Sequence, residues 1–188
     1  MDSPDLAADL VAALVARGQS LATAESLTGG LLGAAITAVP GASAAYIGGV
    51  VAYATAMKHR LARVDAELLA AEGPVSERTA IALAAGVREA TGADWALATT
   101  GVAGPAPQDG HDPGEVWVGL ASPSAPAIAV RHDFTGDRDA VRHATVHAAL
   151  ALLAQALSSE SAPGNNDFPR GVEAASMSYE DGTGRVHP

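Results

Sequence analysis

The sequence predicts an α/β fold, a three-layer α/β/α sandwich in which a mixed parallel and antiparallel sheet lies between layers of helices. Three observations predict it. Short apolar runs that are typical of buried strands alternate with helical apolar periodicity early in the chain, two further strand-like runs follow one another late, and a helical pattern comes last. Alternating strands and helices favour a sheet covered by helices, and the late pair of strands indicates a hairpin that closes it.

In the first half of the chain, helical periodicity over 6–17 ends at Gly18, and residues 20–24 form a short strand-like stretch. A second helix is expected to open within Glu25–Gly30 and to end near Ala38, before Pro40-Gly41. Residues 46–53 predict a buried strand, and helical patterns follow at 55–63, 65–71 and 76–91. Ser76 is the expected N-cap of the last of these helices.

In the second half, residues 94–100 predict a strand that ends in small polar residues and leads into a glycine-rich loop over 101–105. Residues 115–122 and 127–134 predict a hairpin, and the last helix is expected from Asp137 to about Leu157. From Ser158 onward the chain is rich in Ser, Gly, Asn, Asp and Glu, a composition typical of disorder. The expected organisation is therefore one domain over 1–157 and an acidic tail over 158–188.

Composition narrows the classes of function. A length of 188 residues accommodates one domain with a well-buried core. The formal charge of -10 disfavours nucleic acid as a partner, because no broad basic surface is available to neutralise phosphates. The chain has no cysteine, which excludes disulfides, thiolate metal sites and a cysteine nucleophile. We expect a metal-free protein inside the cell.

The apolar segments do not suggest a membrane protein. The first residues, Met1 to Asp5, are acidic where a secretory signal would be basic. No apolar run reaches the roughly 18 residues that span a bilayer. A soluble, cytoplasmic protein is expected.

The first candidate site combines Ser43, in the turn Pro40-Gly41-Ala42-Ser43, with Tyr53 and Lys58. A serine hydroxyl becomes a good nucleophile when a base takes its proton, and a lysine whose pKa is lowered by burial is such a base. Lys58 is the only lysine in a chain that otherwise uses arginine, which a chemical role or codon bias would both explain. A helix-capping serine, a solvated lysine and a core tyrosine are the structural alternatives.

Two glycine-containing segments are candidates for binding a substrate. Ser26, Thr28, Gly29 and Gly30 stand at an expected helix start, where backbone amides attract an anion or a carbonyl oxygen. A plain N-cap with a close-packed glycine pair is the alternative. The second segment follows a strand end, where ligands bind in open α/β sheets, and it contributes Thr100, Gly101 and Gly104.

The start of the last helix carries two cations. Arg138 and Arg142 are four residues apart, so they share a helix face near an N-terminus and would suit a phosphate monoester. Pairing with neighbouring carboxylates is the alternative. His143 and His147 have the same spacing, but no glutamate completes a zinc-binding pattern, and we expect no metal there.

Six segments occur in an order that resembles one family, over roughly residues 6–157. They are ESLTGG (25–30), VPGAS (39–43), GGVVAYATAMK (48–58), GPVSE (73–77), TTGVAGP (99–105) and FTGDRDAVR (134–142). The sequence resembles the CinA C-terminal domain family, the nicotinamide-nucleotide amidohydrolases. The resemblance implies a three-layer α/β domain, usually self-associating, most simply as a dimer. It also implies hydrolysis of nicotinamide mononucleotide to nicotinic acid mononucleotide and ammonia, without metal or cofactor.

The resemblance also implies roles for single residues. Ser43 corresponds to the nucleophile, Lys58 to its base and Tyr53 to a supporting hydroxyl. Hydroxyl positions that line the site correspond to Ser26, Thr28 and Thr100. The phosphate-binding cation corresponds to Arg138 or Arg142.

This chain departs from the family pattern at three places. Leu27 stands where the family commonly has Cys, Ala54-Thr55-Ala56 where it commonly has Ser-Asn-Glu, and His111-Asp112-Pro113-Gly114 where it often has Lys-Pro-Val-Gly. These losses of polar and cationic groups keep open a nucleotide-binding or regulatory module without hydrolysis. An amidase for another small amide is a third alternative, and a metal hydrolase built on the spacing of His143 and His147 is a distant fourth.

Overall fold

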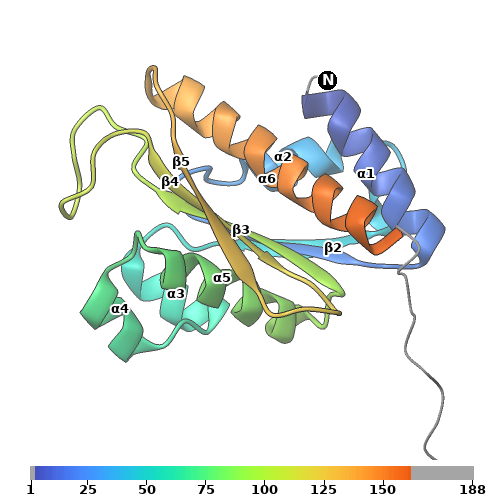
Figure 1. Cartoon of the computed structure of the whole chain (residues 1–188), viewed down its shortest axis with the longest axis horizontal. Helices are drawn as coiled ribbons and strands as arrows, with labels where there is room; N and C mark the ends of the chain where they lie inside the picture. The colour runs from blue at the N-terminus through green and yellow to red at the C-terminus, as the bar shows by residue number, and fades with distance from the viewer. Residues whose placement is uncertain (1–2, 162–188) are drawn as a thin grey trace, which may run out of the picture.

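The computed structural model describes residues 3–161, which form a three-layer α/β/α sandwich (Figure 1). The described elements, in chain order, are α1 (Ser3–Arg17), β1 (Leu21–Glu25), α2 (Leu31–Thr37), the 3-10 helix η1 (Ala42–Ala44), β2 (Tyr46–Val51), α3 (Thr55–Ala62), α4 (Ala66–Glu72), α5 (Glu77–Thr91), β3 (Trp95–Gly101), β4 (Glu115–Ala121), β5 (Ile128–Asp133) and α6 (Arg138–Ser161). The predicted fold class is confirmed.

The five strands form one mixed sheet in the order β2-β1-β3-β4-β5. The strand β1 pairs in parallel with β2 and β3, so that Ala24 lies between Val50 and Ala98. The strands β3, β4 and β5 pair antiparallel, and β4 and β5 form the predicted hairpin. In the parallel half, the carboxyl ends of β2, β1 and β3 therefore lie at the same edge of the sheet.

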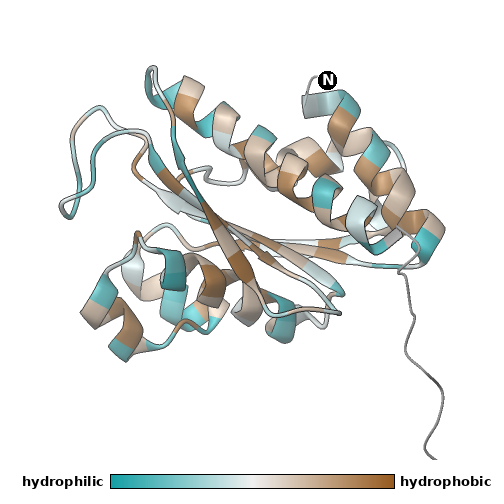
Figure 2. Cartoon of the chain, viewed as in Figure 1, coloured by the Kyte–Doolittle hydropathy of each residue, from teal (hydrophilic) through white to brown (hydrophobic). Residues whose placement is uncertain are grey.

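The two faces of the sheet differ in the size of their side chains. The face beneath α1, α2 and α6 presents large residues, among them Leu21, Trp95 and Leu97. The opposite face presents alanines of β1 and β3 to α5 and its neighbours. Figure 2 shows hydrophobic residues in the strands and in the helices on both sides. Because side chains alternate along a strand, each strand serves both cores.

A glycine lets helices α3 and α5 pack with their backbones in contact. A Cβ atom placed on Gly86 of α5 would lie 1.8 Å from the carbonyl oxygen of Ala62 at the end of α3. Only glycine is compatible with so close an approach. This contact fixes α3, the helix that carries Lys58, against the rest of the domain.

The winding of the chain reverses between β1 and β3. From β1 the chain passes through α2 to β2 on one side, and from β2 it passes through α3, α4 and α5 to β3 on the other side. In open α/β sheets, ligands bind outside the carboxyl ends of the strands at such a switch point. Topology alone therefore points to the ends of β1 and β3, near Glu25 and Gly101.

Most element boundaries agree with the sequence predictions, with three differences. The first helix begins at Ser3 rather than at Leu6, and the second begins at Leu31 rather than within Glu25–Gly30. Helix α6 continues to Ser161, past its expected end. The Ser76 cap is confirmed, since its hydroxyl accepts the Thr79 amide at 3.1 Å. The rest of the predicted tail, residues 162–188, lies outside the described residues. Within the described part of the chain, no helix combines the length and the apolar character needed to cross a bilayer.

Candidate active site

A cavity of about 90 Å³ opens at the carboxyl ends of β1 and β3, where the topology places a ligand site. Its walls come from the turn after β1, the segment after β2, helix α3, the segment before α5, the loop after β3 and the start of α6. The lining residues are Ser26, Leu27, Tyr53, Thr55, Lys58, Pro74, Val75, Thr100, Gly101, Val102, Ala103, Gly104, Ala106, Gln108 and Arg138. The cavity thus gathers residues from across the sequence around one buried amine.

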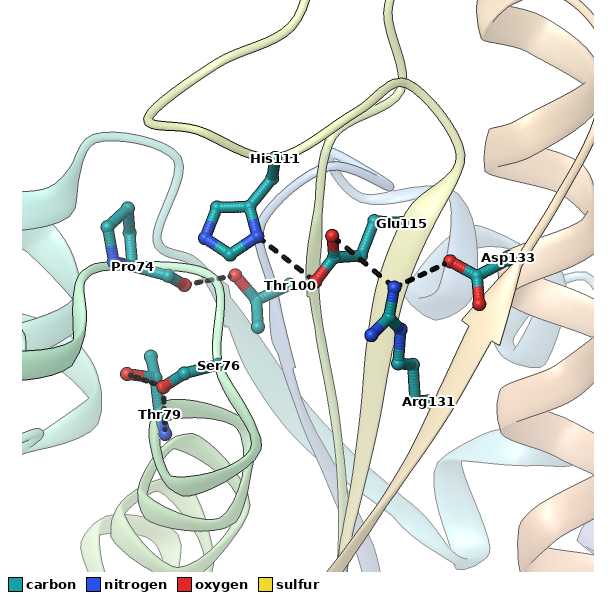
Figure 3. Close-up of polar contacts among 8 residues, drawn as sticks. All are labelled: Pro74, Ser76, Thr79, Thr100, His111, Glu115, Arg131 and Asp133. Atoms are coloured by element: carbon teal, nitrogen blue, oxygen red, sulfur yellow. Dashed lines mark hydrogen bonds and ion pairs between the residues drawn. The ribbon is translucent and has the colours of Figure 1, made fainter.

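Lys58 is the chemically distinctive group of this cavity. Its side chain is only 1% exposed, and its Nζ donates to Thr100 Oγ1 at 3.1 Å. The Thr100 hydroxyl donates in turn to the carbonyl oxygen of Pro74 at 2.6 Å, a contact drawn in Figure 3. Because the Thr100 proton is committed to Pro74, the amine must be the donor in its contact with Thr100. The nitrogen lone pair of an uncharged Lys58 is therefore left for another proton.

Burial lowers the pKa of Lys58 from its ordinary 10.5 to about 8. Among the described residues, no aspartate or glutamate lines the cavity to stabilise the ammonium form. At pH 7 about a tenth of the molecules then carry the free amine, which is a competent general base. The side chain of Lys58 can therefore accept a proton at physiological pH.

Ser26 is the serine that shares the cavity with Lys58. It is the first residue after β1, it is 8% exposed, and its backbone amide donates to the carbonyl oxygen of Thr99 at 3.0 Å. A serine in a tight turn between a parallel strand and a helix has the setting of a hydrolase nucleophile. The sequence resemblance had placed Ser26 among the hydroxyls that line the site rather than at its chemical centre.

The structure does not bring Ser43 and Lys58 together, which corrects the predicted pairing within one chain. Ser43 is exposed in η1, directly before β2, whereas Lys58 follows β2 on α3. A strand of six residues such as β2 spans about 20 Å, so the two residues lie at opposite ends of the sheet. Ser43 is also absent from the residues that line the cavity.

Tyr53 and Arg138 form the outer part of the cavity. Arg138 is exposed, and its Nη2 donates to Tyr53 Oη at 2.8 Å while its Nη1 donates to the carbonyl oxygen of Gly104 at 3.0 Å. Tyr53 is 59% exposed although it is a large aromatic residue. An exposed guanidinium beside a cavity suits the binding of an anionic group.

Four further predicted site residues lie outside the cavity. Thr28 is fully buried and its hydroxyl bonds that of Thr99 at 2.8 Å. The amide of Gly30 donates to the Glu25 carboxylate at 2.9 Å. Gly29 and Arg142 are likewise absent from the lining residues. The turn that carries Ser26 thus reaches the cavity with its first two residues and not with its glycine pair.

The expected anion site at the start of α2 is occupied by the protein itself. The Glu25 carboxylate accepts the amides of Gly30, Leu32 and Gly33, at 2.9, 3.0 and 2.7 Å. A carboxylate at a helix N-terminus satisfies the unpaired amides and the helix dipole. No sequence signature of helix capping identified Glu25, because it stands at the end of the preceding strand rather than at the N-cap position.

The loop between β3 and β4 is anchored by a row of charges (Figure 3). His111 Nδ1 lies 3.0 Å from Glu115 Oε1, Arg131 lies 3.6 Å from the other oxygen of Glu115, and Arg131 also contacts Asp133 at 3.0 Å. The segment in which this chain departs from the family's Lys-Pro-Val-Gly therefore supports the loop rather than the cavity. The loop itself contributes Gln108, a lining residue that the sequence did not indicate.

The two histidines of α6 do not form a metal site. His143 contacts Asp139 at 3.3 Å, and His147 contacts Ser3 Oγ at 3.2 Å. Over residues 3–161, no group of three or more histidines, cysteines or carboxylates is placed to hold a metal ion.

Comparison with known proteins identifies the family. The model of the CinA C-terminal domain matches residues 3–157. A "CinA-like protein" of Frankia casuarinae is 52% identical over 145 residues, which cover 77% of this chain and 33% of that protein. A "CinA-like protein" of Anaeromyxobacter dehalogenans is 50% identical over 155 residues, 82% of this chain and 37% of that protein. The chain thus spans about a third of the length of these curated relatives.

Solved structures agree with the sequence matches. A CinA superfamily protein from Klebsiella pneumoniae superimposes with a TM-score of 0.81 at 37% identity, covering 85% of this chain and 99% of that chain. The competence/damage inducible protein CihA from Agrobacterium tumefaciens gives a TM-score of 0.80 at 32% identity, covering 84% and 96% of the two chains. On the family match, the sequence identities and the shared fold, the chain belongs to the CinA C-terminal domain family.

Proposed function

We propose that this domain is a serine amidohydrolase that converts nicotinamide mononucleotide to nicotinic acid mononucleotide and ammonia. The substrate comes from the family resemblance in the sequence. The observation that carries the chemistry is a buried lysine of lowered pKa that lines the same cavity as a serine. Self-association and a place in the cytoplasm stay predictions.

The nucleophile in this proposal is Ser26 rather than Ser43. Uncharged Lys58 accepts the Ser26 proton as the hydroxyl oxygen attacks the carboxamide carbon, giving a tetrahedral intermediate. The ammonium of Lys58 then returns the proton to the leaving nitrogen, the carbon–nitrogen bond breaks, and ammonia departs from a Ser26 ester. Water, deprotonated by the same amine, attacks the ester, releases the carboxylic acid and restores the Ser26 hydroxyl.

In this proposal the oxyanion would be stabilised by backbone amides of residues that line the cavity after β1 and β3, such as Leu27, Ala103 and Gly104. Donors of this kind contribute about 10²- to 10³-fold in rate each. Arg138, at the outer part of the cavity, is the cation that would hold the nucleotide phosphate. Tyr53 would orient that guanidinium through their hydrogen bond.

The proposed activity is tested by incubating the purified protein with nicotinamide mononucleotide and measuring ammonia together with the nicotinic acid nucleotide. Stoichiometric formation of both products is expected. A folded protein that binds the nucleotide in calorimetry but releases no ammonia would favour the second candidate, a nucleotide-binding module. That candidate is motivated by apolar Leu27, which lines the cavity where the family commonly has cysteine. A panel of other small carboxamides separates the third candidate, a different amidase.

The rate is expected to depend on the ionisation of Lys58. Because only the uncharged amine accepts a proton and its pKa is lowered to about 8, kcat/KM should rise about tenfold per pH unit below pH 8. Above that pH it should level off. A stopped assay of ammonia release between pH 6 and pH 9.5, with Lys58→Arg as the control without a usable base, measures this profile. A flat profile across that range in the wild-type protein would contradict the role of Lys58.

A further inference from the structure

The turn from Ser26 to Gly30 is held from two sides by opposite charges. On one side, the Glu25 carboxylate is 2% exposed and binds three amides at the start of α2. On the other side, Arg142 of α6 reaches the same turn. The position of Ser26 therefore depends on groups that do not line the cavity.

The guanidinium of Arg142 donates hydrogen bonds to backbone carbonyl groups. Its Nε donates to the oxygen of Leu27 at 3.2 Å, and its Nη2 donates to the oxygen of Thr28 at 2.8 Å. In the described part of the chain it forms no ion pair with a carboxylate. A Cβ placed on the neighbouring Gly29 would lie 3.6 Å from Nη2, an ordinary van der Waals distance, so the guanidinium also packs against the turn. The half-buried cation thus braces the turn.

These two contacts fix the orientation of successive peptide groups. Because a peptide is planar, an anchored Leu27 carbonyl also sets the direction of the Thr28 N–H, and an anchored Thr28 carbonyl sets that of Gly29. The Gly29 amide donates back to the carbonyl oxygen of Ser26 at 3.0 Å, which closes the turn. A shift of these planes would move the Ser26 hydroxyl and the neighbouring amides together.

Arg138 differs from Arg142 in each of these respects. It is exposed, it lines the cavity, and it contacts Gly104 and Tyr53 at the outer wall. We propose that Arg142 is a positioning residue that holds the Ser26 turn in its reactive geometry, and that Arg138 rather than Arg142 binds the phosphate of the substrate. This inference rests on the proposed function. It gives Arg138 and Arg142 separate roles, whereas the sequence did not decide which of them binds phosphate.

The test compares Arg142→Gln with the matched variant Arg138→Gln, using nicotinamide mononucleotide as substrate and inorganic phosphate as inhibitor. Arg142→Gln should lower kcat about 10- to 100-fold with KM within about twofold, because displacement of a reacting group by an ångström has such an effect. Arg138→Gln should raise KM and the phosphate inhibition constant about tenfold. An Arg142→Gln protein with unchanged kcat, raised KM and weakened phosphate inhibition would overturn the proposal.

A measurement that does not depend on turnover tests the role of Arg142 separately from the proposed function. Amide hydrogen exchange over residues 27–33, followed by mass spectrometry, should accelerate about tenfold in Arg142→Gln, since a hydrogen bond to a charged group is lost. It should stay unchanged in Arg138→Gln. If neither wild type nor variants release ammonia, the amidohydrolase proposal fails and the exchange rates alone decide the role of Arg142. Unchanged exchange in Arg142→Gln would refute that role.

Discussion

Replacing Ser26 by alanine is expected to lower kcat for nicotinamide mononucleotide by about 10³-fold or more, whereas Ser43→Ala should leave kcat within about twofold. Loss of a nucleophile removes the covalent route and leaves only binding and oxyanion stabilisation. Ser26 lines the cavity with Lys58, while Ser43 is exposed at the other end of β2. Steady-state release of ammonia by the three proteins measures the difference.

Both variants should fold, so the comparison is not confounded by stability. Each substitution removes a single oxygen, and the hydrogen bonds that hold the turn use the backbone of Ser26. Circular dichroism and thermal unfolding provide the control. If Ser43→Ala abolished turnover while Ser26→Ala retained it, the nucleophile would be Ser43 after all, and a cavity within one chain would no longer describe the site.

Replacing Lys58 by methionine is expected to stabilise the protein by about 2–3 kcal/mol at pH 7 while it abolishes turnover. A pKa that falls from 10.5 in the unfolded chain to about 8 in the fold corresponds to about 3 kcal/mol of unfavourable free energy whenever the amine is charged. The methionine side chain has a similar length and carries no charge. The bond from Lys58 Nζ to Thr100 that is lost offsets about 1 kcal/mol of the gain.

The stabilisation by Lys58→Met should depend on pH in a definite direction. Between pH 8 and 10.5 the unfolded chain binds more protons at Lys58 than the folded chain does, so the wild-type protein gains stability as pH rises through this window. The advantage of Lys58→Met should therefore be full below about pH 8 and shrink above it. Urea unfolding at pH 7 and pH 10 measures both values. A variant less stable than the wild type at pH 7 would mean that the buried amine is not strained by its surroundings.

The fold could be predicted from the sequence because its determinants are local. Short apolar runs and helical patterns located each of the five strands and six α-helices that the structure describes, and the succession of two strands near residues 115–134 predicted the hairpin. The start of α2 was missed because its cap, Glu25, lies at the end of β1 and acts across a turn. A tertiary hydrogen bond of this kind leaves no mark in the local pattern.

The candidate site was predicted in part of its membership but not in its centre. Lys58, Thr100 and Arg138 could be named from residue chemistry and motif. Ser43 was paired with Lys58 from residue chemistry and the family resemblance. Neither takes account of the strand β2, which lies between the two residues and separates them by its whole length. Ser26 and Lys58 line the same cavity because β1 and β2 run parallel and both end at the same edge of the sheet.

The most direct measurement of the central claim is the identity of the covalent intermediate. The protein is mixed with nicotinamide mononucleotide, quenched in acid within the first turnover, digested with trypsin and examined by tandem mass spectrometry. A tryptic digest leaves Ser26 and Ser43 on one peptide, Gly18 to Lys58, so fragmentation must separate them. The account predicts an ester of the nicotinic acid nucleotide on Ser26. An ester on Ser43, or turnover that persists in Ser26→Ala without any adduct, would contradict it.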